Sequence, residues 1–262
     1  MSEIKLGIIG GGQLGSMLSE AARKLNIKTI IYCDDPDAPA KNFCDDFIYA
    51  EYNNKDQIFE FAKKVDVITY EFENIPYETL NELNKLKPVK PKPSVNRLIQ
   101  HRLAEKDFIN KLNIRTTRYV QIENKEDLLP LDDFLPGILK TTTLGYDGKG
   151  QYPIKKMDEI NSLNINFENE YILEKLVRLK KEISVIITRF DNHKYEIYEP
   201  IENFHKEQIL RNSKIPAEIS EKIFEQSKEW AVLIAEELKY VGTLCVEFFI
   251  DRNDNLYVNE IA

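Results

Sequence analysis

The chain has 262 residues, of which 42% are hydrophobic and 31% charged, as in globular proteins with one large or two moderate domains. Its formal net charge of -8 argues against general affinity for nucleic acid, which needs a basic surface. No apolar run nears the roughly 20 residues of a membrane span, and three cysteines without metal-ligand spacing fit a reducing compartment. We expect a cytoplasmic protein that binds small molecules, with neither nucleic acid nor membrane among its partners.

Strand and helix patterns alternate along the first part of the chain, which predicts an α/β fold with parallel strands. The predicted strands are residues 5–9, 28–32 and 65–70, and the predicted helices are residues 14–25 and 55–64. Three prolines between residues 88 and 93 favour extended chain and forbid helix, so we place a domain boundary after residue 93. Ser94 is expected to cap one helix, whose apolar positions are Leu98, Leu103, Phe108, Ile109 and Leu112.

Beyond about residue 116, short strands separated by polar turns indicate antiparallel sheet. These strands are residues 137–140, 171–174, 183–189 and 194–199. A long helix is predicted over residues 217–238, followed by a hairpin of strands 243–250 and 256–261. The sequence therefore predicts two domains, residues 1–93 and 94–262.

A glycine-rich turn, Gly10-Gly11-Gly12-Gln13-Leu14-Gly15, lies between the first predicted strand and helix. Such a turn aims the N-terminal amides of the helix at a phosphate. Asp34 and Asp35 follow at about the distance of a ribose-binding acid in a dinucleotide site. NAD or FAD, another phosphate ligand, and simple tight packing are all compatible with this motif. A later predicted strand ends near Glu71 and Glu73, where open α/β sheets bind ligands.

A second glycine-rich loop, Leu144-Gly145-Tyr146-Asp147-Gly148-Lys149-Gly150-Gln151, follows a strand that ends at Lys140. Glycine amides approach an anion closely because no Cβ intervenes. Lys140 and Lys149 add positive charge that neutralises phosphate when such a loop closes. This loop indicates chemistry on a nucleoside triphosphate.

Glu247 and Glu260 lie on the two arms of the last predicted hairpin. A loop of residues 252–255 would place them directly across from each other, where like charges are destabilising. A divalent cation between them would reverse that effect, and Mg²⁺ on carboxylates and nucleotide phosphates is the usual arrangement. A five-residue loop would instead place them on opposite faces. Asn259 can add a neutral oxygen ligand.

Five segments, in order, resemble the N5-carboxyaminoimidazole ribonucleotide synthase family of the ATP-grasp superfamily. They are residues 7–15 (GIIGGGQLG), 66–76 (DVITYEFENIP), 145–151 (GYDGKGQ), 246–249 (VEFF) and 258–262 (VNEIA). The resemblance spans residues 4–262 and implies a Rossmann-like N-terminal domain, then an ATP-grasp domain of antiparallel sheets and helices with a lid at about residues 115–180. It also implies a homodimeric ligase of purine biosynthesis. That enzyme carboxylates 5-aminoimidazole ribonucleotide with bicarbonate and ATP, through carboxyphosphate, to N5-carboxyaminoimidazole ribonucleotide.

The resemblance further implies the ligand contacts, with ATP between lid and body and Mg²⁺ held by Glu247 and Glu260. The implied ATP contacts are Arg97, Lys140, Gly145, Tyr146, Asp147, Gly148, Lys149, Gly150, Gln151, Glu174, Lys175, Leu176, Val177, Glu182, His205, Asn259 and Glu260. The implied substrate contacts are Gly12, Gln13, Leu14 and Glu73, with the first glycine turn on the substrate phosphate. Tyr146 and Lys149 are the implied catalytic residues of the closing loop.

Leu144 and Ser16 depart from the family pattern, which usually has glycine and a basic residue at these positions. The family also continues beyond the position of Ala262, so we expect a C-terminally truncated chain that is poorly active and unstable. Three other functions fit part of the pattern: a formate-dependent glycinamide ribonucleotide transformylase, a non-catalytic nucleotide-binding remnant, and an NAD-dependent oxidoreductase. The oxidoreductase leaves the second glycine loop and the carboxylate pair without a role.

Overall fold

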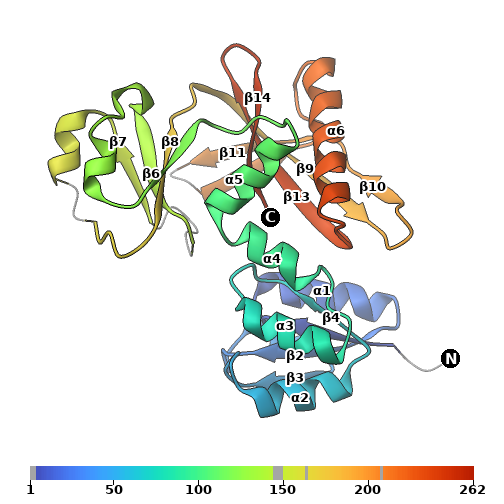
Figure 1. Ribbon diagram of the computed structural model, residues 1–262. Helices are drawn as coiled ribbons and strands as arrows, with labels where there is room; N and C mark the ends of the chain where they lie inside the picture. The colour runs from blue at the N-terminus through green and yellow to red at the C-terminus, as the bar shows by residue number, and fades with distance from the viewer. Residues whose placement is uncertain (1–3, 144–149, 163–164, 207–208) are drawn as a thin grey trace. The chain divides into compact units, whose positions relative to one another are not determined.

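The structure is a computed structural model that describes residues 4–143, 150–162, 165–206 and 209–262 (Figure 1). The chain divides into two compact units. The first comprises the chain up to Arg97 together with residues 240–242, and the second comprises residues 98–239 and 243–262. Within the described ranges, no helix combines the length and the apolar character that crossing a membrane requires.

The first unit is a parallel sheet with the strand order β3-β2-β1-β4, which confirms the predicted α/β class. Its elements are β1 (Lys5–Ile9), α1 (Gln13–Lys24), β2 (Lys28–Cys33), β3 (Asp46–Tyr49), α2 (Lys55–Lys64), β4 (Val67–Tyr70), α3 (Tyr77–Leu86) and α4 (Pro93–Ile99). We did not predict β3 and α3. β3 has only four residues, and the N-cap of α3, Pro76, makes no side-chain hydrogen bond, so neither element carries a strong start signal.

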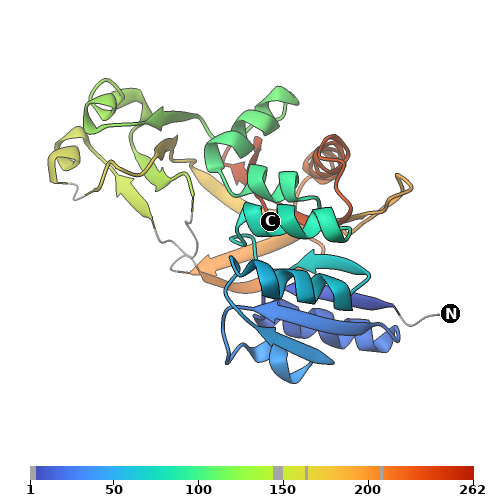
Figure 2. The same ribbon diagram turned by 60° about the horizontal axis from the view of Figure 1, so that its bottom comes forward.

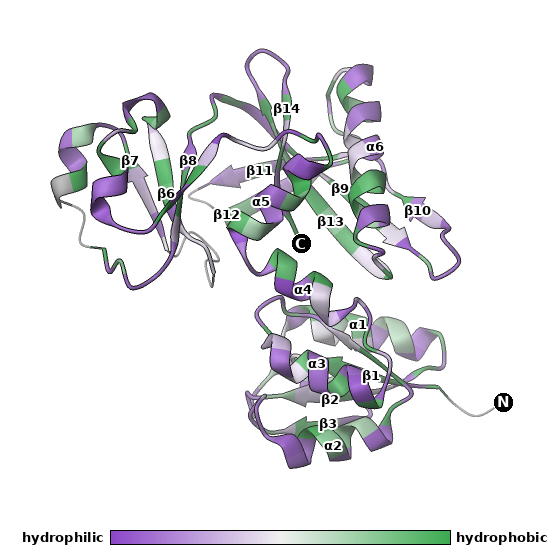
Figure 3. Cartoon of the chain, viewed as in Figure 1, coloured by the Kyte–Doolittle hydropathy of each residue, from purple (hydrophilic) through white to green (hydrophobic). Residues whose placement is uncertain are grey.

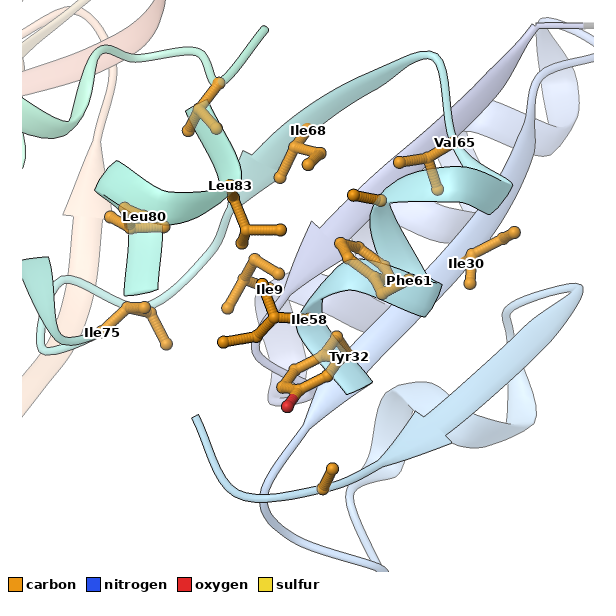
Figure 4. Packing of buried hydrophobic residues seen from close by; sticks show 13 residues of the cluster. Ile9, Ile30, Tyr32, Ile58, Phe61, Val65, Ile68, Ile75, Leu80 and Leu83 are labelled. Atoms are coloured by element: carbon orange, nitrogen blue, oxygen red, sulfur yellow. The ribbon is translucent and has the colours of Figure 1, made fainter. Parts of the chain in front are cut away.

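Both faces of this sheet are buried, because successive side chains of a strand point to opposite faces. On one face, Ile9 and Tyr32 pack with Phe61 of α2 and Leu83 of α3 (Figure 4). On the other face, the core contains Ile8, Ile31, Cys33, Ala38 and Ala40, with Leu18 of α1 against it. Each fully buried aliphatic or aromatic side chain contributes about 1.5–3 kcal/mol. The sheet therefore holds its strand ends, and the loops that follow them, on a rigid base.

Two helices replace the single helix that we expected from residue 94. Helix α4 begins at Pro93, so Ser94 lies inside it and does not cap it; proline suits a first helical position because its missing N–H is not needed there. Helix α5 (Arg102–Lys111) begins after His101, whose ring nitrogen accepts a hydrogen bond from the Ala104 N–H. The predicted cap was therefore wrong, and His101 caps a new helix.

The second unit contains two antiparallel sheets, which confirms the predicted sheet type. The four-stranded sheet has the order β5-β8-β6-β7 and consists of β5 (Tyr119–Ile122), β6 (Gly137–Thr141), β7 (Gln151–Ile154) and β8 (Tyr171–Lys175). The six-stranded sheet has the order β12-β11-β9-β13-β14, with β10 beside β9. Its strands are β9 (Leu179–Arg189), β10 (Tyr195–Ile197), β11 (Ile201–Lys206), β12 (Ile209–Lys214), β13 (Gly242–Asp251) and β14 (Leu256–Ile261).

Helix α6 (Glu221–Glu237) lies beside the six-stranded sheet, and Figure 2 shows it nearly end-on. Apolar and polar stretches alternate along it (Figure 3), and its buried residues include Ile223, Ala231 and Ile234. The helix begins after Ser220, later than the predicted start at residue 217, because the Ser220 hydroxyl accepts a hydrogen bond from the Ile223 N–H and so caps the first turn.

The last hairpin pairs Glu247 with Glu260. The predicted loop of residues 252–255 would also have paired them, but the hairpin has a different loop and register. The Asp251 N–H donates to the Asn255 carbonyl at 3.0 Å, so the tight loop spans residues 252–254. The register then shifts between Glu247 and Phe248, which pairs with Val258, leaving Asn259 as the extra residue of a β-bulge. A bulge adds one residue to one strand, and here that residue brings the two carboxylates opposite each other.

Candidate functional site

Two buried lysines share one buried carboxylate in the second unit. The Lys140 ammonium lies 3.1 Å from Glu174 Oε2, and the Lys106 ammonium lies 3.5 Å from Glu174 Oε1. Thr117 donates its hydroxyl hydrogen to Glu174 Oε2 at 3.1 Å and accepts a hydrogen bond from Lys106 at 3.2 Å. The side chains of Lys106, Lys140 and Glu174 are 2%, 9% and 5% exposed, so water contributes little screening.

The strands and helix α5 explain why these three side chains meet. β6 and β8 are antiparallel neighbours in which Ile138 lies opposite Glu174. Lys140 is two residues beyond Ile138, on the same face of the strand, so its side chain reaches Glu174 diagonally. Lys106 lies on α5 and contacts the same carboxylate. We call Lys106, Lys140 and Glu174 the lysine cluster.

The lysine cluster carries one more positive than negative charge. Burial raises the pKa of Glu174, but the ammonium groups of Lys106 and Lys140 outweigh burial and hold that pKa at about 2. Burial lowers the pKa of Lys106, and the repulsion of Lys140 adds to this against the attraction of Glu174. The carboxylate is thus well compensated, whereas within the cluster two cations share one anion. Glu105 also attracts Lys106, but burial and the charge of Glu260 raise the pKa of Glu105 itself to about 8. A second anion at this place would compensate the excess charge.

The second group of charges surrounds the carboxylates of the last hairpin. Glu247 and Glu260 are half-buried and opposite each other on β13 and β14. Burial, followed by the charges of Glu260 and Glu182, raises the pKa of Glu247 to about 7, against a hydrogen bond from Asn259. Arg102 Nη1 lies 3.2 Å from Glu260 Oε2. We call Glu247, Asn259 and Glu260 the carboxylate pair with its amide.

This pair suits a hard divalent cation. Two carboxylates and an amide oxygen are oxygen ligands, which Mg²⁺ prefers, and Mg²⁺ usually takes one or two protein carboxylates and completes its shell with water and phosphate oxygens. Among the residues that the structure describes, no group of three or more His, Cys, Asp or Glu side chains forms a complete metal site. A metal at this place would therefore depend on oxygens from a bound nucleotide.

Glu182 and His205 form a third group of charged side chains in the second unit. Strands β9 and β11 pair Glu182 with Asn203, and His205 Nδ1 lies 2.8 Å from Glu182 Oε2 with both side chains 25% exposed. Burial raises the pKa of Glu182, although the neighbouring His205 acts to lower it. The structure thus brings together two residues that the sequence singled out without any pairing signal. The charge of Glu182 also helps to raise the pKa of Glu247.

Backbone hydrogen bonds within the protein hold residues 175–177, the segment that follows Glu174. The Lys175 N–H donates to the Arg118 carbonyl and the Leu176 N–H to the Pro136 carbonyl, both at 2.9 Å. The Val177 carbonyl accepts from the Leu179 N–H at 2.8 Å. Glu174 itself lies in the lysine cluster, so its carboxylate is already engaged by cations.

Most of the second glycine-rich loop, including Gly145, Tyr146, Asp147, Gly148 and Lys149, lies outside the described residues. Its C-terminal end is described. Gly150 has φ +69°, and a Cβ there would lie 2.5 Å from Thr141 Oγ1, so only glycine fits. Gln151 then pairs with Lys140. The loop therefore returns to the sheet directly beside the lysine cluster.

Helix α5 contributes three site residues that we did not predict. Arg102, Glu105 and Lys106 lie on one side of the helix, at the i, i+3 and i+4 spacing that places side chains together. The sequence signal for these three residues is this charged spacing. Arg97, which we had expected at the nucleotide phosphates, belongs to the first unit, where its guanidinium lies 4.9 Å from the Tyr77 ring centroid.

In the first unit, a carboxylate already occupies the glycine turn. Glu71 Oε1 accepts a hydrogen bond from the Gly12 N–H at 2.9 Å, and a Cβ at Gly10 (φ +98°) would lie 2.6 Å from the same oxygen. Ser16 is buried and donates its hydroxyl hydrogen to the Gly12 carbonyl at 3.1 Å. The amide expected at a substrate phosphate is thus bonded to an acid, which would repel phosphate. Gln13 and Leu14 open α1 and are exposed, as is Glu73.

Comparisons with known proteins cover nearly the whole chain. An ATP-grasp domain family matches residues 107–262, and the ribonucleotide synthetase preATP-grasp domain matches residues 3–100. The N5-carboxyaminoimidazole ribonucleotide synthase of Staphylococcus epidermidis (strain RP62A) is 38% identical over 261 residues, which is 98% of this chain and 69% of that protein. The NAD-dependent oxidoreductase alternative is therefore wrong.

Solved structures agree with the sequence relatives. The ADP complex of N5-carboxyaminoimidazole synthetase from Staphylococcus aureus matches with a TM-score of 0.92 and 34% identity, over 99% of this chain and 70% of that chain. The Aspergillus clavatus synthase with ADP and 5-aminoimidazole ribonucleotide matches with a TM-score of 0.87 and 26% identity, over 99% and 69%. These matches confirm the resemblance read from the five sequence segments. The chain belongs to the N5-carboxyaminoimidazole ribonucleotide synthase family of ATP-grasp proteins.

Proposed function

We propose that this protein uses ATP and bicarbonate to carboxylate 5-aminoimidazole ribonucleotide, giving N5-carboxyaminoimidazole ribonucleotide, ADP and phosphate in purine biosynthesis. The ATP-grasp domain makes the chain a ligase, and relatives bind ADP and 5-aminoimidazole ribonucleotide. The observation in this chain that carries the proposal is the lysine cluster, which has two buried cations for one carboxylate. A nucleotide phosphate is the anion that would complete it.

Lys106 and Lys140 are the residues that we assign to the phosphates of ATP, together with Arg102. Their positive charge is held in a buried place, where it acts on phosphoryl oxygens more strongly than in water. Arg102 is 16% exposed and lies 3.2 Å from Glu260 of the carboxylate pair, and its charge also acts to lower the pKa of Glu174 in the lysine cluster. We assign Arg102 to this contact because it lies on the same helix as Lys106, and Arg97, which the resemblance implies at the phosphates, stays a second candidate.

Other nucleotide contacts follow from the family. We assign Lys175, Leu176 and Val177 to the adenine edge, and Glu182 with His205 to the ribose. Glu247 and Glu260, with Asn259 beside them, would hold Mg²⁺. Bound there, Mg²⁺ would neutralise charge on the nucleotide phosphates.

The reaction has two steps. A bicarbonate oxygen attacks the γ-phosphorus of ATP and ADP leaves, which forms carboxyphosphate; the exocyclic amine of the ribonucleotide then takes the carboxyl group, and phosphate leaves. Lysine ammonium groups stabilise the charge that the phosphoryl oxygens carry during transfer. We assign Tyr146 and Lys149 to the loop that excludes water from carboxyphosphate.

For the ribonucleotide, we infer contacts from Gln13, Leu14 and Glu73 to its amine or ribose. The Glu71 carboxylate on the Gly12 N–H disfavours the substrate phosphate at this turn, which is where the family resemblance would place it. We also propose that the protein is a cytoplasmic homodimer. Residues 1–93 and 94–262 would be its domains, with a lid at about residues 115–180.

ADP release measured with a coupled assay tests the proposal. We expect release that requires both bicarbonate and 5-aminoimidazole ribonucleotide, with N5-carboxyaminoimidazole ribonucleotide as the product. Release with formate and glycinamide ribonucleotide would instead identify a transformylase. ADP binding without any turnover would favour a nucleotide-binding remnant.

A further inference from the structure

Glu105 is a buried carboxylate that none of the roles above uses. It lies on α5, is 3% exposed, and its Oε1 accepts a hydrogen bond of 2.7 Å from the N–H of Ile261, 156 residues along the chain. Ile261 follows Glu260, one of the two carboxylates assigned to Mg²⁺. A side chain from α5 therefore binds the main chain of the strand that presents this carboxylate.

The geometry of β14 explains why this N–H needs a partner. β14 is the last strand in the order of the six-stranded sheet. Cys245 and Ala262 exchange two backbone hydrogen bonds of 2.8 Å each. The neighbouring pair of Val246 and Ile261 is therefore a non-hydrogen-bonded pair, in which the backbone N–H groups point away from the partner strand. The Ile261 N–H thus points away from β13, and an unbonded N–H buried there would be costly. Glu105 supplies the acceptor.

The same helix also holds the side chain of Glu260. Arg102 Nη1 lies 3.2 Å from Glu260 Oε2, and Arg102 precedes Glu105 by three residues, so both side chains lie on one face of α5. Helix α5 therefore contacts Glu260 at its carboxylate and holds the next residue by its backbone. The β-bulge at Asn259 makes the register of this part of β14 irregular. The hydrogen bond from the Ile261 N–H to Glu105 would hold the strand in position there.

We propose that Glu105 is a positioning residue that, by holding the Ile261 N–H, sets the position of the Glu260 carboxylate for metal binding. This inference rests on the proposed function. Outer groups that orient metal ligands typically contribute 10- to 100-fold to metal affinity. Loss of the Glu105 bond should therefore weaken the response to magnesium, while nucleotide binding without metal, which depends on the lysine cluster, should change little.

The test is calorimetric titration of ADP into the protein in MgCl₂ and, separately, in EDTA. Wild-type protein should bind ADP more tightly in MgCl₂. Glu105→Ala should reduce that gain by about tenfold and leave the affinity in EDTA within about twofold. Glu105→Gln keeps an acceptor oxygen for the Ile261 N–H and should retain the magnesium gain. If the alanine variant does not fold, Glu105→Asp, whose shorter side chain draws back from Ile261, should show the same loss in milder form.

Glu202→Ala is the matched control. Glu202 is also buried, at 5% exposure, and its carboxylate also accepts a backbone N–H, from Glu218 at 3.1 Å, but its hydrogen bonds do not involve the carboxylate pair. Its loss should leave the magnesium gain unchanged. An equal loss in Glu202→Ala, or an unchanged gain in Glu105→Ala, would overturn the inference while wild-type binding upholds the proposed function. Wild-type protein that binds no ADP would overturn both.

Discussion

Replacing Glu174 by glutamine should destabilise the second unit, because it removes the only acid of the lysine cluster and leaves Lys106 and Lys140 buried together. The pKa of Glu174 is held at about 2, against an ordinary value of 4.5. At about 1.4 kcal/mol per pKa unit, this difference corresponds to about 3 kcal/mol. Removing one partner of a buried ion pair typically costs about 3–5 kcal/mol, which agrees. We expect a loss of about 3 kcal/mol at neutral pH.

Tryptophan fluorescence during urea unfolding measures this loss where it occurs. The chain has a single tryptophan, Trp230, which lies on α6 beside Phe248, so its signal reports on the second unit alone. With a urea dependence of about 2 kcal/mol per molar, the midpoint of Glu174→Gln should fall by about 1.5 M. The control is Glu218→Gln, which removes an exposed ion pair with Lys214 and should not shift the midpoint measurably.

The pH dependence gives a second check with a definite sign. The folded pKa of Glu174 lies below its unfolded value, so the stability that it contributes is present above about pH 4.5. This contribution is lost as the pH falls toward the folded value of about 2. The difference between wild type and Glu174→Gln should therefore shrink from pH 5 to pH 2.5. A midpoint shift under 0.5 M at pH 7, or a difference that does not depend on pH, would refute the reasoning.

Three further predictions concern the same unit. Lys140→Met should leave the ligand-free protein as stable as wild type or more stable, because one cation then faces Glu174. Its ADP affinity should fall at least about tenfold, since hydrogen bonds to charged groups contribute about 1.5–3 kcal/mol. Calorimetry measures both the stability of the ligand-free protein and its affinity for ADP. Glu247→Gln should raise the urea midpoint at pH 8 without metal, where Glu247 (pKa about 7) is ionised, and should remove the difference between ADP affinities in MgCl₂ and EDTA. Ser220→Ala should cost about 1 kcal/mol through the lost cap of α6, seen in Trp230 fluorescence; no change would show that the cap bond contributes nothing.

Helix and strand periods predicted several of the regular elements. Strand β1 and helix α2 have the bounds that we expected, because apolar spacing is set by local geometry. Strands β3, β5 and β7 were missed because four residues each are too few to establish a period. The longer elements α3, β11 and β12 were missed as well. Ser94 has the chemistry of a cap but is not one, because Pro93 already begins the helix.

The candidate site was only partly predictable. Lys140, Glu247 and Glu260 stood out because each lies beside a recognisable motif, a glycine loop or a hairpin. Lys106 and Glu105 lie on a helix of mixed charge and carry no such signal, since their importance comes from contacts with Glu174 and Ile261 far along the chain.

By itself, the sequence determined the α/β class, the antiparallel second part and the family, because local periods and short motifs are written in neighbouring residues. Only the tertiary structure decided which charges meet. It placed two lysines on Glu174, filled the glycine turn with the carboxylate of Glu71, and set Glu247 opposite Glu260 through a bulge that the loop length alone does not reveal. These contacts join residues distant in the chain, and their energies depend on burial, which the packed fold alone creates.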